Sequence, residues 1–245
     1  MNHRARWPAA YSSSLRPSGS TCGPATRRTR AVQSYRRTMS IANEERAALV
    51  QTLRTVGPDA PTLCPGWTTR QLAAHLVGRE RRPDAFLGIA VPRFAERWHR
   101  IEQQFATDHE WTALVDQLAA GPPVYSPLRW LNRVANIHEM FVHHEDVRRA
   151  VPGWTPRALD GRTVDALRRL ARSFGPVVMP GVPAKVTFNT PDGAALARFG
   201  SGPEVTVTGA PGELLLFAFG RNEIQVEFAG DADVIDAVRR SERRF

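Results

Sequence analysis

The stretch NIHEMFVHHEDV, residues 136–147, is rich in histidine and acidic side chains, which are common metal ligands. It superficially resembles the zinc-protease motif H-E-x-x-H, whose two histidines lie four residues apart on one helix face. Here His138 and His143 are five residues apart. At about 100° per residue their side chains diverge by about 140°, so they cannot bind one ion together. The stretch is therefore not a zinc-protease motif.

Glu139 and His143 do have a suitable spacing. Four residues apart on a helix, their Cβ atoms are expected about 5–6 Å from each other on one face. Residues that share or border this face are apolar, which predicts that both polar groups point into the core: Leu128, Leu131, Ala135 and Val142. A buried carboxylate needs a cation or several hydrogen-bond donors. A divalent metal would meet that need.

A third ligand is expected on an interior stripe of another helix, and His75 meets this requirement. Leu72 and Leu76 flank it at helical spacing. Together with Glu139 and His143 it makes a set of two histidines and one glutamate. Three protein ligands leave a position open for water or substrate, which is typical of catalytic sites. Nitrogen and oxygen ligands favour zinc first, with nickel, iron(II) and manganese as alternatives.

The same residues also have a purely structural interpretation. A histidine beside an apolar face is usually a satisfied core or rim residue, and Glu139 could pair with an arginine such as Arg79. His138 and His144 lie on other faces of the predicted helix, so each is expected in solvent or in an ion pair. Spacing alone leaves both interpretations open.

Two charged residues are further candidates. Asp146 lies one turn beyond the predicted ligands and could orient His143 by accepting a hydrogen bond. It could equally pair with Arg148 or Arg149. Arg221 follows a predicted helix end, where the helix dipole favours a cation. If the C-terminal part folds over the helical part, Arg221 is a candidate catalytic residue that would bind a substrate or cofactor carboxylate.

Cys64 precedes a predicted helix, whose N-terminal dipole could lower the pKa of the thiol and activate it as a nucleophile. We prefer the interpretation that it is a small buried residue at a tight corner. Trp67 is expected to pack against the start of the same helix rather than bind substrate.

The composition is that of a soluble globular protein, with 245 residues, 42% hydrophobic and 23% charged. No apolar run approaches the roughly 20 residues that span a bilayer. Two cysteines cannot form a disulfide framework, which favours a cytoplasmic protein. The net charge of +9 comes mainly from residues 1–38, which hold eight arginines and no acidic residue. The rest is nearly neutral, so nucleic-acid binding is not expected of it.

Residues 1–38 lack apolar periodicity and a signal-peptide core. We interpret them as a disordered Arg-rich tail, or as translated sequence ahead of a start at Met39. A transit-like or nucleic-acid-binding arm is the alternative. From residue 39 the pattern changes to amphipathic helices, and we predict a four-helix bundle over residues 39–173. The predicted helices are 40–57, 68–82, 92–107 resuming at 110–121, and 127–151, with a bridging helix near 160–173.

Specific residues predict where two of these helices begin and end. Ser40 is a suitable N-cap and Gly57 a suitable stop, and Thr68 and Gln71 have capping-box spacing. Residues 174–245 change to alternating polarity and predict a small α+β domain with an antiparallel or mixed sheet. Its strands are predicted at 184–190, 204–209 and 223–230, and its helices at 210–220 and 231–245.

LCPGWTTRQLAAHLVGRE (63–80) and EMFVHHEDVRRA (139–150) resemble the mycothiol-dependent maleylpyruvate isomerase family, which belongs to the DinB-like metal-binding bundles of actinobacteria. The segment VTVTGAPGELLLFAFGR is similar to the sterol-carrier-like α+β domain that follows many of these bundles. The resemblance covers about residues 40–240. The residues that match the family pattern are Cys64, Pro65, Gly66, Trp67, Thr68, Leu72, His75, Leu76, Glu139, His143 and Asp146.

The resemblance implies that His75, Glu139 and His143 bind the metal and that a low-molecular-weight thiol, mycothiol, is the cofactor. A metal lowers the pKa of a bound thiol and so presents a thiolate at neutral pH. We therefore expect a cytoplasmic enzyme that isomerises a small electrophile or transfers a thiol to it. The alternative is a non-catalytic module that binds a metal or a small apolar ligand. Neither a membrane nor a nucleic acid is an expected partner.

Overall fold

The structure, a computed structural model, describes residues 40–82, 95–126, 128–129 and 135–243. The prediction for residues 1–38 lies outside this set, as do the start of the helix predicted at 92–107 and most of the start of that at 127–151. Within it, Ser40 accepts a hydrogen bond from the backbone N–H of Asn43 and begins the first helix, as predicted. Gly57 ends that helix with a φ of 80°, a conformation that favours glycine.

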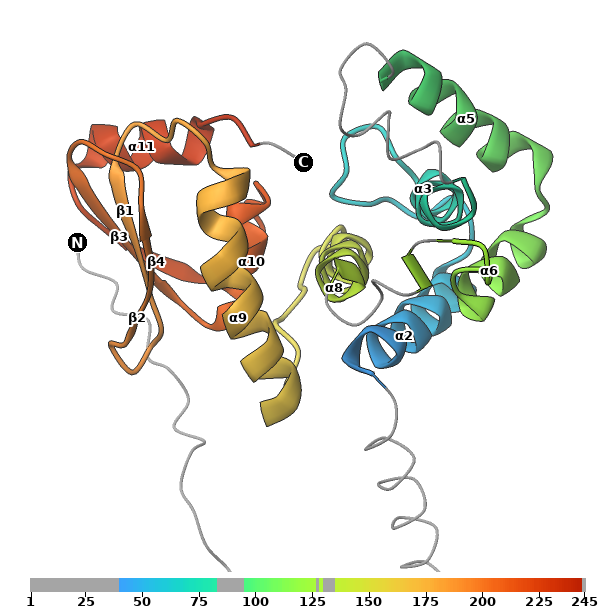
Figure 1. The fold of residues 1–245 in the computed structure, drawn as a ribbon, viewed down its shortest axis with the longest axis horizontal. Helices are drawn as coiled ribbons and strands as arrows, with labels where there is room; N and C mark the ends of the chain where they lie inside the picture. The colour runs from blue at the N-terminus through green and yellow to red at the C-terminus, as the bar shows by residue number, and fades with distance from the viewer. Residues whose placement is uncertain (1–39, 83–94, 127, 130–134, 244–245) are drawn as a thin grey trace, which may run out of the picture. The chain divides into compact units, whose positions relative to one another are not determined.

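Five helices form the bundle part of the described chain (Figure 1). They are α2 (Ile41–Val56), α3 (Thr69–Arg81), α5 (Ala95–Asp108), α6 (Trp111–Ala120) and α8 (Ala135–Arg148). Helix α2 packs on α8 and α6, while α3 packs on α5 and α6. The predicted four-helix bundle is thus present, with its third helical region divided into α5 and α6. Helix α8 ends at Arg148, three residues before the predicted end.

Helix α8 is buried on two sides, and it belongs to two hydrophobic clusters. Met140 and Val147 pack with residues of α2, α3 and α6. Phe141 and Val142 pack with residues of the C-terminal helices and strands. Such a helix has no broad polar face. The spacing of its apolar residues alone therefore could not predict which helices and strands pack against it.

The C-terminal part contains a four-stranded mixed sheet, in the order β2-β1-β3-β4. The strands are β1 (Lys185–Asn189), β2 (Ala195–Phe199), β3 (Glu204–Gly209) and β4 (Val226–Ala229). β1 pairs with β2 antiparallel and with β3 parallel, and β3 pairs with β4 antiparallel. The predicted mixed sheet is confirmed, and β2 is a strand that the sequence analysis did not predict.

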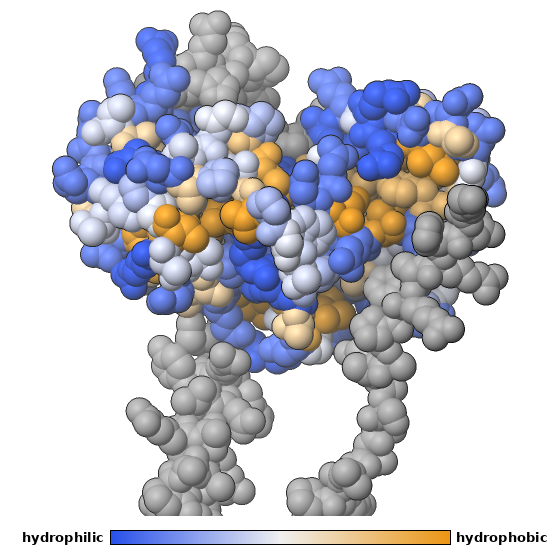
Figure 2. Space-filling view, turned by 180° about the vertical axis from the view of Figure 1, so that it is seen from behind, coloured by the Kyte–Doolittle hydropathy of each residue, from blue (hydrophilic) through white to orange (hydrophobic). Residues whose placement is uncertain are grey.

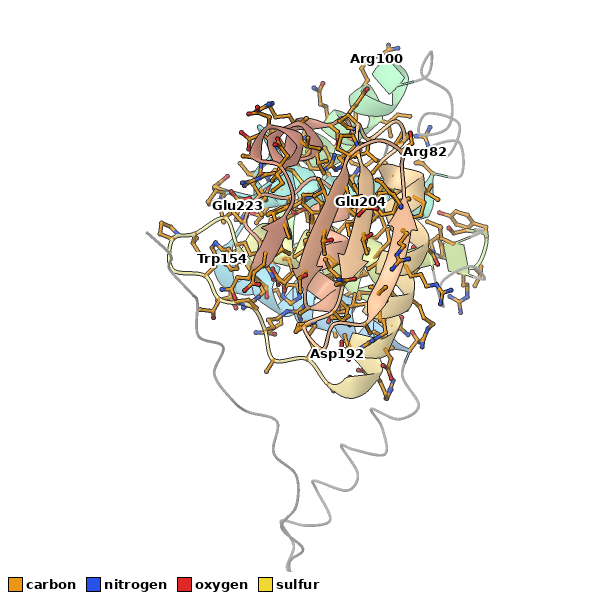
Figure 3. All side chains as sticks on the ribbon, turned by 90° about the vertical axis from the view of Figure 1, so that its left-hand side faces the viewer. Arg82, Arg100, Trp154, Asp192, Glu204 and Glu223 are labelled. Carbon is orange, nitrogen blue, oxygen red and sulfur yellow. The ribbon has the colours of Figure 1, made fainter. Side chains whose placement is uncertain are left out.

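Helices cover one face of this sheet (Figure 1). α9 (Gly161–Val178) packs on β2 and α10 (Pro211–Ala218), and α10 packs on β3. The chain ends with α11 (Ala232–Arg240). Inward residues of the central strands are fully buried: Val186, Phe188, Val205 and Val207. The opposite face is open in Figure 3, where the exposed Glu204 is labelled.

Among the described residues, every helix is too short or too polar to cross a membrane. Hydrophilic residues cover most of the face in Figure 2, and hydrophobic residues appear there as smaller patches. The apolar α10 is wholly buried, as expected for a core helix.

Candidate metal centre

The three predicted ligands come together in the structure. His75, Glu139 and His143 each offer one ligand atom, and these atoms lie within 4.8 Å of one another. Nε2 of His143 is 3.4 Å from Oε2 of Glu139, and the two histidine rings are 5.4 Å apart at their centroids. Zinc binds nitrogen and oxygen at about 2.0–2.2 Å, so small side-chain shifts would bring all three atoms onto one ion.

Two helices position this set. A capping box between Thr68 and Gln71 begins α3, as predicted, and His75 lies in its second turn. The fully buried Leu72 and Leu76 fix the rotation of α3 about its axis. The Trp67 ring packs 5.2 Å from that of His75, between their centroids, and so also supports the site.

A carboxylate holds Nδ1 of each histidine. Nδ1 of His75 is hydrogen-bonded to Glu102 on α5, and Nδ1 of His143 lies 2.9 Å from Oδ2 of Asp146. Nε2 is then the ring nitrogen that can bind an ion, and the carboxylate fixes the tautomer and the ring plane. Asp146 thus accepts a hydrogen bond from His143, which is one of the two roles predicted for it. Sequence reasoning missed Glu102. The signal that could have found it is an acidic residue between two hydrophobic residues of one helix, Ile101 and Phe105, which the structure shows to be buried and partly buried.

Glu139 has cationic and histidine neighbours on both oxygens. Arg79 lies 3.4 Å and His138 3.5 Å from Oε1, while His143 faces Oε2. Burial would raise the pKa of Glu139, but Arg79, His138 and His143 outweigh it and hold the pKa well below its usual range. The carboxylate is therefore ionised and able to bind a cation. The ion pair between Glu139 and Arg79, which the purely structural interpretation expected, is also present.

The pKa of His143 is shifted in the opposite direction. Burial would lower it, but hydrogen bonds to Asp146, Cys64 and Glu139 together raise it well above 6.5. The surroundings of His143 in the ion-free protein therefore stabilise its protonated, imidazolium form. A metal must displace its proton before Nε2 can bind.

Asp146 is fully buried and is paired with Arg221. Arg221 donates from Nε to Oδ1 at 2.8 Å and from Nη2 to Oδ2 at 2.6 Å. Burial would raise the pKa of Asp146, but Arg221 and His143 lower it far below 3.8. The alternative partners, Arg148 and Arg149, both bind Glu145 instead. In this structure, Arg221 thus binds a carboxylate of the protein itself.

A second group of possible ligands shares His143. Cys64, His143 and Asp146 also offer ligand atoms within 4.8 Å of one another. Nη2 of Arg221 lies 3.7 Å from the Cys64 sulfur, so a fixed cation already occupies this side. Arg221 also donates to both oxygens of Asp146, so it already engages two of these three groups. In the set with His75, Arg79 contacts only one oxygen of Glu139, which makes that set the better candidate. Cys64 is only partly buried, whereas the preferred interpretation was a small buried residue at a tight corner.

The two remaining histidines of the stretch 136–147, His138 and His144, are buried, and each contacts a glutamate. Nδ1 of His144 lies 3.4 Å from Glu45, and its Nε2 lies 2.9 Å from the Thr52 hydroxyl. His138 contacts Glu139 and packs against the ring of Phe174. Of the two environments predicted for them, contact with an acid is observed and solvent is not.

The fold and this site describe a protein with a helical bundle, a set of candidate metal ligands inside it and a small mixed sheet. No protein-family model matches the sequence, and no curated protein matches it. Two solved structures do match the fold: the crystal structure of the mycothiol-dependent maleylpyruvate isomerase and that of a histidine-to-alanine mutant. Each has a TM-score of 0.55 and 15% sequence identity over 78% of this chain and 92% of that chain. The chain has the fold that the sequence resemblance implied.

Proposed function

We propose that this protein is a divalent-metal-binding, thiol-dependent enzyme that acts on a small electrophile by isomerisation or thiol transfer. The observation that carries the proposal is the convergence of His75, Glu139 and His143 inside the bundle. A carboxylate on Nδ1 of each histidine adds to it, because metal-binding histidines are usually oriented in this way. The shared fold with a mycothiol-dependent isomerase suggests mycothiol as the thiol.

The donor set fits a divalent cation. It has two imidazoles and one ionised carboxylate, and it would leave a coordination position open. When bound, zinc or a similar cation would lower the pKa of a thiol and so supply a thiolate at neutral pH. Glu102 and Asp146 would keep the histidine rings oriented. Arg79 balances the charge of Glu139 from the other side.

A thiolate in such a site can lead to two outcomes. In isomerisation, the thiol would supply a nucleophile that adds reversibly to an activated double bond and so permits rotation before it leaves. In transfer, it would supply the sulfur that bonds to carbon while a leaving group departs with its electron pair. Both outcomes fit the proposed site. The proposal also includes a cytoplasmic location and the division into a bundle of residues 39–173 and an α+β domain of residues 174–245. Helix α9 crosses this boundary and packs on β2 and α10.

Cobalt(II) provides a direct test, because a thiolate bound to cobalt absorbs in the near ultraviolet. We expect titration of the cobalt-loaded protein with mycothiol to produce this absorption. The matched control is the His75→Ala, His143→Ala double variant, in which the absorption should be missing. Loaded wild-type protein whose spectrum is unchanged by mycothiol would contradict the thiol-dependent function and leave metal binding intact.

The Arg79 contact favours a second candidate. Because Arg79 already offsets the charge of Glu139, the bundle can be stable without an ion, as a non-catalytic module would be. Such a protein would show no turnover that depends on mycothiol. A search for mycothiol-dependent consumption of small unsaturated acids, with and without added zinc, separates the two candidates.

A further inference from the structure

Two arginine–carboxylate pairs connect the end of α8 with the chain around α10. In one pair the arginine comes from the chain around α10, and in the other it comes from the end of α8. Arg221, which follows α10, donates two hydrogen bonds to Asp146 of α8. In the other pair, Arg149 at the end of α8 donates from Nη1 and Nη2 to Glu213 of α10, at 2.9 and 2.6 Å. Such two-bond pairs fix orientation as well as distance.

The second pair also holds the segment 219–225 by its backbone. Nη1 of Arg149 donates to the carbonyl of Glu223 at 2.6 Å, and Glu213 accepts from the N–H of Gln225 at 2.7 Å. The ring of Trp154 covers the Arg149 guanidinium, with 4.4 Å between the ring centroid and Cζ. Trp154 and Glu223 are labelled on the same side of the molecule in Figure 3.

This segment carries Arg221 to the metal centre. It turns at Gly220, whose φ of 76° favours glycine, and Arg221 comes next. A continuous set of contacts then runs from Arg149 and Glu213 through the segment to Arg221, to Asp146 and to Nδ1 of His143. Movement of the segment would therefore move the group that orients His143.

We infer that Arg149 and Glu213 are positioning residues of the candidate metal centre, although neither is among its candidate ligands. They hold Arg221 against Asp146, and Asp146 sets the ring of His143. The C-terminal part of the chain is then required for a well-formed centre. This inference rests on the proposed function only where it concerns metal affinity.

A purely structural role is the competing explanation, since Arg149 is 3% and Glu213 5% exposed. The pair Arg46–Glu80 offers a matched control. It is similarly buried, at 4% and 1%, and it joins α2 to α3 away from the segment 219–225. Removing the charge from either pair should destabilise the fold, but only one of them should affect His143.

The first experiment compares Glu213→Gln with Glu80→Gln in zinc affinity, measured by competition with a chelator. We expect Glu213→Gln to weaken zinc binding about tenfold and Glu80→Gln to change it less than about twofold. Added to Arg221→Met, Glu213→Gln should have less than about a twofold further effect, because it acts through Arg221. Equal effects of the two glutamine variants, or full additivity with Arg221→Met, would overturn the inference. Arg149→Lys, which keeps the charge but loses the two-bond geometry, replaces Glu213→Gln if that variant does not fold.

A second readout needs no metal. In the ion-free protein, the ¹⁵N NMR signal of Nδ1 in His143 reports its hydrogen bond to Asp146. Glu213→Gln should shift or broaden this signal, and Glu80→Gln should leave it in place. An unchanged signal in Glu213→Gln overturns the inference even if the wild-type protein binds no zinc. The proposed function would fail separately, by the lack of zinc binding in the wild type.

Discussion

Glu102 and Asp146 matter at the residue scale because each holds one of the two histidine rings. Replacing either by its amide keeps the size but removes the charge that orients the ring. We predict that Glu102→Gln and Asp146→Asn each weaken zinc binding by about 10- to 100-fold in a chelator competition. The control is Asp116→Asn, which changes an exposed acid paired with Arg54. Amide variants that bind zinc as tightly as this control would show that the carboxylates do not support the site.

The raised pKa of His143 predicts how the site responds to pH. In the ion-free protein, the stabilisation from its imidazolium is fully present below about pH 6.5 and is lost as the pH rises through the folded-state pKa. Zinc must replace the proton, so its affinity should rise by up to about tenfold per pH unit below that pKa. The increase in melting temperature caused by zinc should therefore grow between about pH 6 and pH 8. A shift that shrinks over this range would contradict the assigned proton.

The candidate ligands could be predicted from the sequence because helical spacing relates nearby residues. Glu139 and His143 are one turn apart, and His75 has apolar neighbours at the same spacing. Glu102 and Arg221 are 27 and 75 residues from the partners they bind, His75 and Asp146. Their contacts depend on how helices and strands pack, which local periodicity does not determine.

At the scale of elements, the start of α3 can be tested alone. The Thr68 side chain and Gln71 complete the capping box that begins the helix carrying His75. We predict that Thr68→Ala lowers the free energy of unfolding by about 1 kcal/mol in urea. Thr107→Ala, at an exposed position near the end of α5, should change it by less than about 0.5 kcal/mol. Equal stability of the two variants would show that the cap contributes nothing.

Two elements differ from their sequence-based prediction for physical reasons. The strand β2 contains ALARF, which has little β-branched content, and it is defined by its pairing with β1. Helix α9 extends to Val178, past the predicted end at 173, although Pro176 lies inside its last turn. Packing against α10 and β2 outweighs the unfavourable proline there.

At the scale of the whole molecule, charge is concentrated in residues 1–38, and the remainder is close to neutral. We predict that a protein beginning at Met39 does not bind DNA in a salt-dependent manner, because few cations remain unbalanced. Fluorescence anisotropy with a labelled duplex at low and moderate salt would measure this. Salt-sensitive binding by the shortened protein would contradict the assignment of the basic charge to residues 1–38.

The central claim is that side chains from α3 and α8 bind one divalent ion. Elemental analysis after exposure to zinc and removal of excess metal tests it most directly. We predict about one ion per wild-type chain and nearly none in the His75→Ala, His143→Ala variant, which lacks two of three ligands. Circular dichroism should confirm that this variant is folded. Equal metal content in the two proteins, or none in the wild type, would contradict the claim.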